Sequence, residues 1–128
     1  MNNLTNISPI DGRYYNKTSK LREYFSEYSL IRGRVEIEIE WFRFLSEQYS
    51  IPEIPKFSSK AKNFLENIIF NFNISDAEEI KNIESITNHD VKAVEYWLKS
   101  KIAINEEIHK HKEFIHFGCT SEDINNIA

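Results

Sequence analysis

Apolar residues recur at intervals of three and four along two stretches of the chain, the spacing that lines one side of an α-helix. In the first stretch the apolar positions are Ala61, Phe64, Leu65, Ile68 and Ile69. In the second they are Val91, Val94, Leu98 and Ile102, with Trp97 alongside. These patterns predict a helix capped by Ser58 or Ser59 that runs to about Phe72, and another that begins at Thr87.

Between these stretches, Ser75 with Glu78 three residues later forms a capping-box pattern, which predicts a helix over about 75–85. The passage from Val35 to Trp41 instead alternates strictly between apolar and acidic residues, which is typical of a strand. A strand there would need turn signals on both sides, and Phe42 to Ser50 contains none. We therefore expect one long helix, or two abutting helices, over about 17–49.

Both ends of the chain look different from its middle. Ser8-Pro9 and Asp11-Gly12 are turn signals, so we expect residues 1–16 to be irregular. A short helix is expected over about 108–117, and a final helix begins at Thr120 or Ser121 and has run for only a turn or two at Ala128. The chain is therefore expected to be all-α, with an irregular N-terminal segment, and to be a fragment of a longer protein.

Composition narrows the class of protein. With 128 residues, 41% hydrophobic and 28% charged, the chain has the composition of a single globular domain. A net charge of -4 argues against a nucleic-acid partner, which would favour a basic face. No apolar run is long enough to span a membrane, and the start of the chain lacks a signal-peptide layout. The single Cys119 excludes an internal disulfide, so we expect a cytoplasmic protein.

Two helix starts share one pattern, a threonine followed three residues later by an aspartate: Thr87 with Asp90, and Thr120 with Asp123. Capping of the backbone N–H groups explains both without any ligand. The alternative is a binding site, because Asn88-His89 at one end and Ser121 at the other add donors to N–H groups that favour anions. Arg13 with Tyr14 can add a cation and an aromatic surface, although a lone arginine in a turn is usually a solvated surface group.

The remaining candidates for chemistry are weaker. His109 and His111 point in different directions if they lie on a helix, and no cluster of thiolates or carboxylates completes a tetrahedral ligand set with them or with His116. We expect no metal site. Cys119 has no base beside it in the sequence, which favours a small buried residue over a nucleophile.

Three segments carry a resemblance to a known family: "SPIDGRYY" (8–15), "TNHDVKAVEY" (87–96) and "EFIHFGCTSEDINN" (113–126). In order and spacing they resemble the bacterial adenylosuccinate lyases, which belong to the fumarase/aspartase superfamily, along essentially the whole chain. The resemblance implies a mostly helical, three-domain homotetramer that needs no metal or organic cofactor. It also implies β-elimination of fumarate from adenylosuccinate, giving AMP, and from succinyl-aminoimidazole-carboxamide ribotide in purine biosynthesis.

Family roles carry over by position. Arg13 and Tyr14 match a pair that contacts the nucleotide. Asn88, His89 and Asp90 match the substrate-binding loop, in which His89 is closest to a catalytic role, either moving a proton or positioning the substrate. Thr120 and Ser121 match a pair that contacts the succinyl carboxylates. Both helix starts thus fall on binding segments of the family, and a capped helix end can also bind an anion.

The resemblance also implies what is missing. The family's general acid, a later histidine, and its base, a serine on a flexible loop, lie beyond Ala128, so the fragment alone is expected to be inactive. We expect residues 1–111 to form the N-terminal helical domain and residues 112–128 the start of a truncated central helical bundle. Two alternatives stay open: a sibling such as argininosuccinate lyase, and a non-catalytic helical interaction module in which Asn88, His89 and Thr120 only cap helices.

Overall fold

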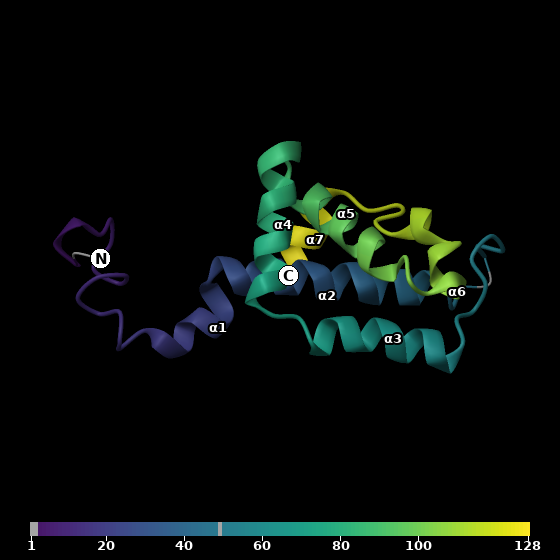
Figure 1. Ribbon diagram of the computed structural model, residues 1–128, viewed down its shortest axis with the longest axis horizontal. Coiled ribbons are helices and arrows are strands. Elements are labelled where there is room, and N and C mark those ends of the chain that lie inside the picture. Colours follow the sequence, from purple (N-terminus) through teal and green to yellow (C-terminus); the bar gives the residue numbers. More distant parts are fainter. Residues whose placement is uncertain (1–2, 49) are drawn as a thin grey trace. The chain divides into compact units, whose positions relative to one another are not determined.

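The computed structural model describes residues 3–48 and 50–128, and within them it contains helices and no strand (Figure 1). The elements are η1 (Asn3–Thr5), η2 (Ser19–Leu21), α1 (Arg22–Phe25), α2 (Glu27–Leu45), α3 (Ser59–Phe70), α4 (Ile74–Thr87), α5 (Asp90–Ile102), α6 (Glu106–His109), η3 (Lys112–Phe114) and α7 (Ser121–Ile127). The all-α prediction is confirmed. No helix of the described residues combines the length and the apolar character needed to cross a membrane.

The chain divides into two compact units, one up to Leu30 and one from Ile31 to Ala128. In the first unit, the segment predicted to be irregular over 1–16 forms η1 and then a series of turns in its described part, residues 3–16, while residues 1 and 2 lie outside the described residues. The backbone N–H groups of Asp11 and Gly12 both donate to the carbonyl of Ser8 at 3.2 Å. The expected boundary at residues 111 and 112 is a different division of the chain and stays a prediction.

The helical stretch expected from residue 17 to residue 49 is broken at Ser26. Ser26 has an extended backbone (φ -84°, ψ 160°), which ends α1. Its hydroxyl then accepts the N–H of Ser29 at 3.1 Å, as a capping serine does at the start of a helix. Of the two predicted alternatives, abutting helices are therefore correct. The second of these helices, α2, ends at Leu45, and the expected end at Tyr49 lies outside the described residues.

The alternating passage forms part of helix α2, as expected. The buried residues of this helix are Ile31, Arg34, Val35, Glu38, Ile39, Phe42 and Leu45, a set spaced by three and four. Glu36 and Glu40 are exposed. The strand-like alternation is therefore a by-product of a helical stripe that includes two charged residues, Arg34 and Glu38.

Helix α3 runs antiparallel to α2 (Figure 1). Arg43 pairs with Glu66 at 2.8 Å, and Glu47, just beyond the end of α2, pairs with Lys62 near the start of α3. Ser58 caps α3 as predicted, accepting the N–H of Ala61 at 3.1 Å. Ala61 and Leu65 of the predicted stripe are buried, whereas Phe64, Ile68 and Ile69 are half-buried.

The capping residue of helix α4 lies two residues earlier than predicted. Asn73, not Ser75, is the cap: its side-chain oxygen accepts the N–H groups of Ser75 (2.9 Å) and Asp76 (3.4 Å). Asp76 in turn accepts the N–H of Asn73 at 3.1 Å, which completes a capping box. The reason is the backbone of Asn73, which is extended (φ -140°, ψ 179°), whereas Ser75 is already helical.

The residues predicted to form the core face of helix α5 are buried, and the helix packs against α4. Val91, Val94, Trp97, Leu98 and Ile102 are each at most 2% exposed. The indole N–H of Trp97 donates to Glu79 of α4 at 2.9 Å, and Lys101 pairs with the same carboxylate at 3.0 Å. These contacts fix the angle between the two helices, and therefore the position of the short junction between them.

The helix predicted over 108–117 is wrong in extent. The chain forms only α6, a turn and η3 there, and His116 (φ 63°) and Gly118 (φ 75°) are left-handed. Two left-handed residues cannot continue a right-handed helix. They turn the chain toward Thr120, which caps α7 as predicted.

The position of the cap on α4 can be tested by two alanine substitutions. Asn73→Ala removes the acceptor for two N–H groups and should lower the free energy of unfolding by about 1 kcal/mol. Ser75→Ala, an exposed helical position, should leave it within about 0.5 kcal/mol of wild type. Urea unfolding followed by circular dichroism measures both. A larger loss for Ser75→Ala than for Asn73→Ala would place the cap where the sequence alone suggested.

Candidate functional site

The junction between α4 and α5 is built by one left-handed residue followed by one extended residue. Asn88 (φ 52°, ψ 31°) ends α4, its N–H donating to the carbonyl of Glu84 at 2.8 Å. Asparagine is one of the few residues besides glycine that tolerates this conformation. His89 (φ -147°, ψ 114°) then starts α5. Thr87 is therefore the last residue of α4, and its predicted role as the cap of the next helix is wrong.

His89 itself is the cap of α5. Its Nδ1 accepts the backbone N–H of Lys92 at 3.1 Å. Because an accepting ring nitrogen carries no proton, a neutral His89 must hold its proton on Nε2. That Nε2 faces the hydroxyl of Ser121 at 3.4 Å, and the side chain is half-exposed. The starts of α5 and α7 are thus brought together.

Thr120 and Ser121 have different local roles. The Asp123 carboxylate accepts both the backbone N–H (2.7 Å) and the hydroxyl (2.8 Å) of Thr120, forming a capping box. These two hydrogen bonds hold the pKa of Asp123 below its ordinary value. The Thr120 hydroxyl is therefore engaged in capping, whereas the Ser121 hydroxyl points toward His89.

Asp90, the first residue of α5, is bound through both carboxylate oxygens. Oδ1 accepts the N–H of Val91 at 2.8 Å, and Oδ2 pairs with Nη2 of Arg34 at 2.7 Å. Burial raises the pKa of Asp90, but the Val91 hydrogen bond and the Arg34 charge outweigh it and hold the pKa below its ordinary value. Asp90 is therefore a fixed negative charge next to His89.

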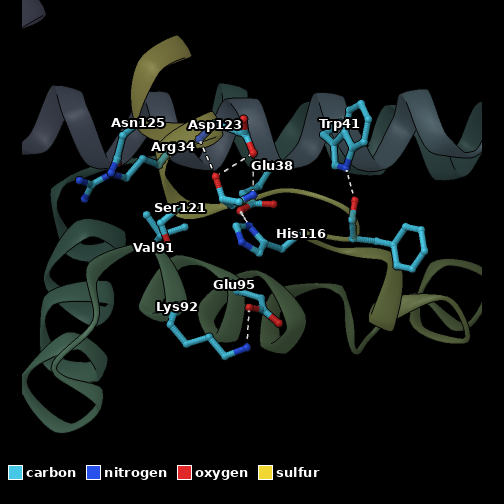
Figure 2. Close-up of polar contacts among 12 residues, drawn as sticks. Arg34, Glu38, Trp41, Val91, Lys92, Glu95, His116, Ser121, Asp123 and Asn125 are labelled. Atoms are coloured by element: carbon cyan, nitrogen blue, oxygen red, sulfur yellow. Dashed lines mark hydrogen bonds and ion pairs between the residues drawn. The ribbon is translucent and has the colours of Figure 1, made fainter.

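Arg34 was not found from the sequence. Its side chain is only 7% exposed, and its Nε donates to the side-chain oxygen of Asn125 in α7 at 2.8 Å. Figure 2 shows Arg34 and Asn125 side by side beneath α2. The signal in the sequence was the position of Arg34, three residues after Ile31 on the buried stripe of α2.

Two further side chains of α2 hold the segment that leads to α7 (Figure 2). Glu38 is fully buried, its Oε1 lies 2.6 Å from Nδ1 of His116, and its Oε2 has no hydrogen-bond partner among the described residues. Burial raises the pKa of Glu38, and the contact with His116 offsets this only in part. The indole N–H of Trp41 donates to the carbonyl of Phe117 at 2.8 Å.

An open groove of about 570 Å³ lies at the α4–α5 junction. It is lined by Lys81, Glu84, Ser85, Asn88, His89 and Asp90. A larger hollow of about 780 Å³ lies over α3 and α6, but none of the predicted site residues lines it. We favour the smaller groove as the binding site because a helix start and three predicted residues border it.

Five of the seven predicted site residues lie in the second unit. Asn88, His89 and Asp90 line the groove, and Thr120 and Ser121 lie at the start of α7, where Ser121 contacts His89. Arg13 and Tyr14 belong to the first unit, where the Arg13 guanidinium lies 5.3 Å from the centroid of the Tyr14 ring and Lys17 lies 5.9 Å from it. This pair therefore offers a cationic and aromatic surface on its own unit.

The described residues include neither an activated thiol nor a set of metal ligands. Burial, with the carboxylates of Glu38 and Asp123, raises the pKa of the half-buried Cys119, which keeps its thiol protonated. Across the part of the chain that the structure describes, no group of three or more His, Cys, Asp or Glu side chains is placed to hold a metal ion.

Comparison with known proteins finds clear relatives. A family model described as "Lyase" matches residues 12–128. The chain is 56% identical over 125 residues to an adenylosuccinate lyase of Legionella pneumophila (strain Corby), covering 98% of this chain and 27% of that protein. It is 51% identical over 128 residues to an adenylosuccinate lyase of Escherichia coli (strain K12), covering 100% of this chain and 28% of that protein. The chain thus spans little more than a quarter of these relatives.

The buried carboxyl of Glu38 should give the protein a distinctive pH dependence. A carboxyl whose pKa is raised on folding binds its proton more tightly in the native state, so stability falls as pH rises from the ordinary value of 4.5 through the raised value. Each pH unit of that window is worth at most about 1.4 kcal/mol. Glu38→Gln, which faces the same His116 and Glu95, should lack this loss. Urea unfolding at a series of pH values measures the difference.

The matched control is Glu36→Gln, because Glu36 is an exposed carboxyl on the same helix. It should follow the wild-type dependence on pH. If Glu38→Gln and wild type differ by the same free energy at every pH, burial does not raise the pKa of Glu38.

Proposed function

The chain belongs to the lyase family, within the helical fumarase/aspartase superfamily, and from this premise we propose that it is the N-terminal part of an adenylosuccinate lyase. The complete enzyme would release fumarate from adenylosuccinate, giving AMP, and from succinyl-aminoimidazole-carboxamide ribotide in purine biosynthesis. The observation that carries the proposal is the contact at 3.4 Å between Nε2 of His89 and the hydroxyl of Ser121. These two residues come from two separate motifs of the resemblance.

The reaction explains why donors should gather at this point. In β-elimination a base removes a proton from the carbon next to a carboxylate, and the C–N bond then breaks with its electron pair leaving on nitrogen, which is protonated. The intermediate carries extra negative charge on that carboxylate. Donors fixed in advance around it stabilise the transition state more than the ground state. The Nε2–H of His89 and the Ser121 hydroxyl are suitable donors.

The cap on α5 defines what His89 can contribute. Because Nδ1 is occupied by the N–H of Lys92, only Nε2 is free to meet a substrate, and in the neutral ring Nε2 carries the proton. In this state His89 would donate a hydrogen bond from Nε2 toward a substrate oxygen or nitrogen, rather than act as the base. To give up the proton itself the ring would first have to be protonated on Nδ1, which would break the hydrogen bond from Lys92. Asp90 beside it stabilises any positive charge that the ring acquires.

The remaining roles follow the resemblance. Asn88 and Asp90 would bind substrate beside His89, Thr120 and Ser121 would hold the succinyl carboxylates, and Arg13 with Tyr14 would contact the nucleotide. We assign no general base among the described residues, so residues 1–128 alone should show no turnover. The complete protein would be a cytoplasmic homotetramer without a cofactor, with residues 1–111 as its first domain.

The substitution His89→Asn, made in the complete polypeptide that carries this sequence, separates the role of His89 in turnover from its role as a helix cap. Asparagine places an acceptor near the position of Nδ1 and is a favoured cap, so the unfolding temperature should stay close to that of wild type. It has no group at the position of Nε2, so turnover should fall by roughly 10²–10⁴. Fumarate release from adenylosuccinate, followed by its absorbance, measures the effect.

Two controls make the result specific. His111→Ala removes a histidine that packs against Phe57, away from the groove, and should leave turnover near wild type. Argininosuccinate should release no fumarate with any variant. Wild-type turnover of argininosuccinate instead would assign the sibling activity, and no turnover of either substrate would favour a helical interaction module. Full activity of His89→Asn would reduce His89 to a helix cap.

A further inference from the structure

We propose that Arg34 is a positioning residue of this site: by holding Asp90 and Asn125 together, its guanidinium sets the distance between His89 and Ser121. Nη2 binds the first residue of α5 at 2.7 Å, and Nε binds α7 at 2.8 Å. The inference rests on the proposed function for the effect on catalysis, but its geometric part stands apart from it.

The surroundings of Arg34 indicate that it does more than stabilise the fold. Its side chain is only 7% exposed and lies near Ile31 and Val35 on the buried stripe of α2, which is apolar apart from Arg34 and Glu38. Arg34 is buried whereas the Asp90 side chain is 42% exposed. Buried charges and their partners can often be replaced by apolar residues of similar size without loss of stability, so folding alone does not require a charge at position 34. Arginine does offer several donors on a planar, rigid group, which can bind two partners in fixed directions.

The two partners of Arg34 are adjacent to the residues that meet in the site. Asp90 follows His89 directly, and Asn125 lies four residues after Ser121, which places both on one side of α7. The contact between His89 and Ser121 is long, at 3.4 Å, and too weak to fix its own distance. The shorter hydrogen bonds of Arg34, one of them to a carboxylate, are stronger and act on the same two helices.

The ion pair between Arg34 and Asp90 has a second effect, on the charge that borders the groove. Asp90 lies in the groove beside His89, and its Oδ1 is already held by the N–H of Val91. Arg34 fixes the other oxygen, so the carboxylate has one orientation and its charge is partly neutralised. Without Arg34 the carboxylate can rotate into the groove, where it would repel the carboxylates of a succinyl substrate.

The test uses the complete polypeptide with Arg34→Met, which fills the space, and Arg34→Lys, which keeps the charge but not the fork. Arg34→Met should lower kcat for adenylosuccinate roughly 10- to 100-fold, with a smaller change in KM, because misplaced donors act mainly on the transition state. Arg34→Lys should recover only part of the loss. Arg32→Met, an exposed position on the same helix, should keep wild-type kcat.

A stability control separates positioning from damage to the fold. Leu98→Ala, in the core of α5 and away from Asp90, should lower Tm while leaving kcat near wild type well below Tm. If Leu98→Ala loses as much kcat as Arg34→Met, or if Arg34→Met keeps wild-type kcat, Arg34 does not position the site.

A crystal structure of the Arg34→Met polypeptide tests the geometry without any substrate. The separation of His89 Nε2 and Ser121 Oγ should increase beyond hydrogen-bond range, and Asp90 should change its rotamer. An unchanged separation overturns the inference. If wild type releases no fumarate but this separation increases in the variant, the proposed reaction fails and the positioning role of Arg34 stands.

Discussion

Two opposite charges buried one turn apart on α2 are the constraint on which the rest of this site depends. Arg34 and Glu38 occupy positions that would otherwise be apolar, so each must find partners or lose stability. Arg34 finds them in α5 and α7, and Glu38 finds one in the segment between η3 and α7. Together with Trp41, they make one face of a single helix the base to which the binding segments are attached.

The two charges are not compensated equally. Arg34 has an ionised partner in Asp90 and a neutral one in Asn125, and its charge is well matched. Glu38 has one oxygen on His116 and the other without a partner among the described residues, which is why burial dominates its pKa. The left-handed backbone of His116 adds to this local cost. Such a cost is understandable if this segment must present the next helix start at a fixed place.

How much of this the sequence predicts depends on the range of the interaction involved. All five residues predicted for the core face of helix α5 are buried, because periodicity is a local signal, while the buried Ala93 and Glu95 were not predicted. The cap of α5 was assigned to Thr87, and His89 was named as a cap only in the interaction-module alternative. Threonine, asparagine and histidine can all cap a helix, and the choice depends on which residue turns left-handed, here Asn88. Asn73 was missed in favour of Ser75 because both residue types cap helices, and the choice depends on which backbone is extended, here that of Asn73. The pairing of Arg34 with Asp90 joins residues 56 positions apart, and no local pattern reports it.

Helix capping and substrate binding are alternative explanations of the two helix starts in the sequence. At His89 they are linked, because the capping hydrogen bond also orients the ring for binding. The hydrogen bond from Lys92 to Nδ1 satisfies the backbone of α5, and it also determines that the proton of the neutral ring lies on Nε2. An uncapped histidine at the same place would be free to rotate and to exchange tautomers. The cap therefore gives the ring one orientation and one donor, directed toward the start of α7. At Thr120 the two explanations separate, because its hydroxyl is engaged by Asp123, which leaves Ser121 as the hydroxyl that faces His89.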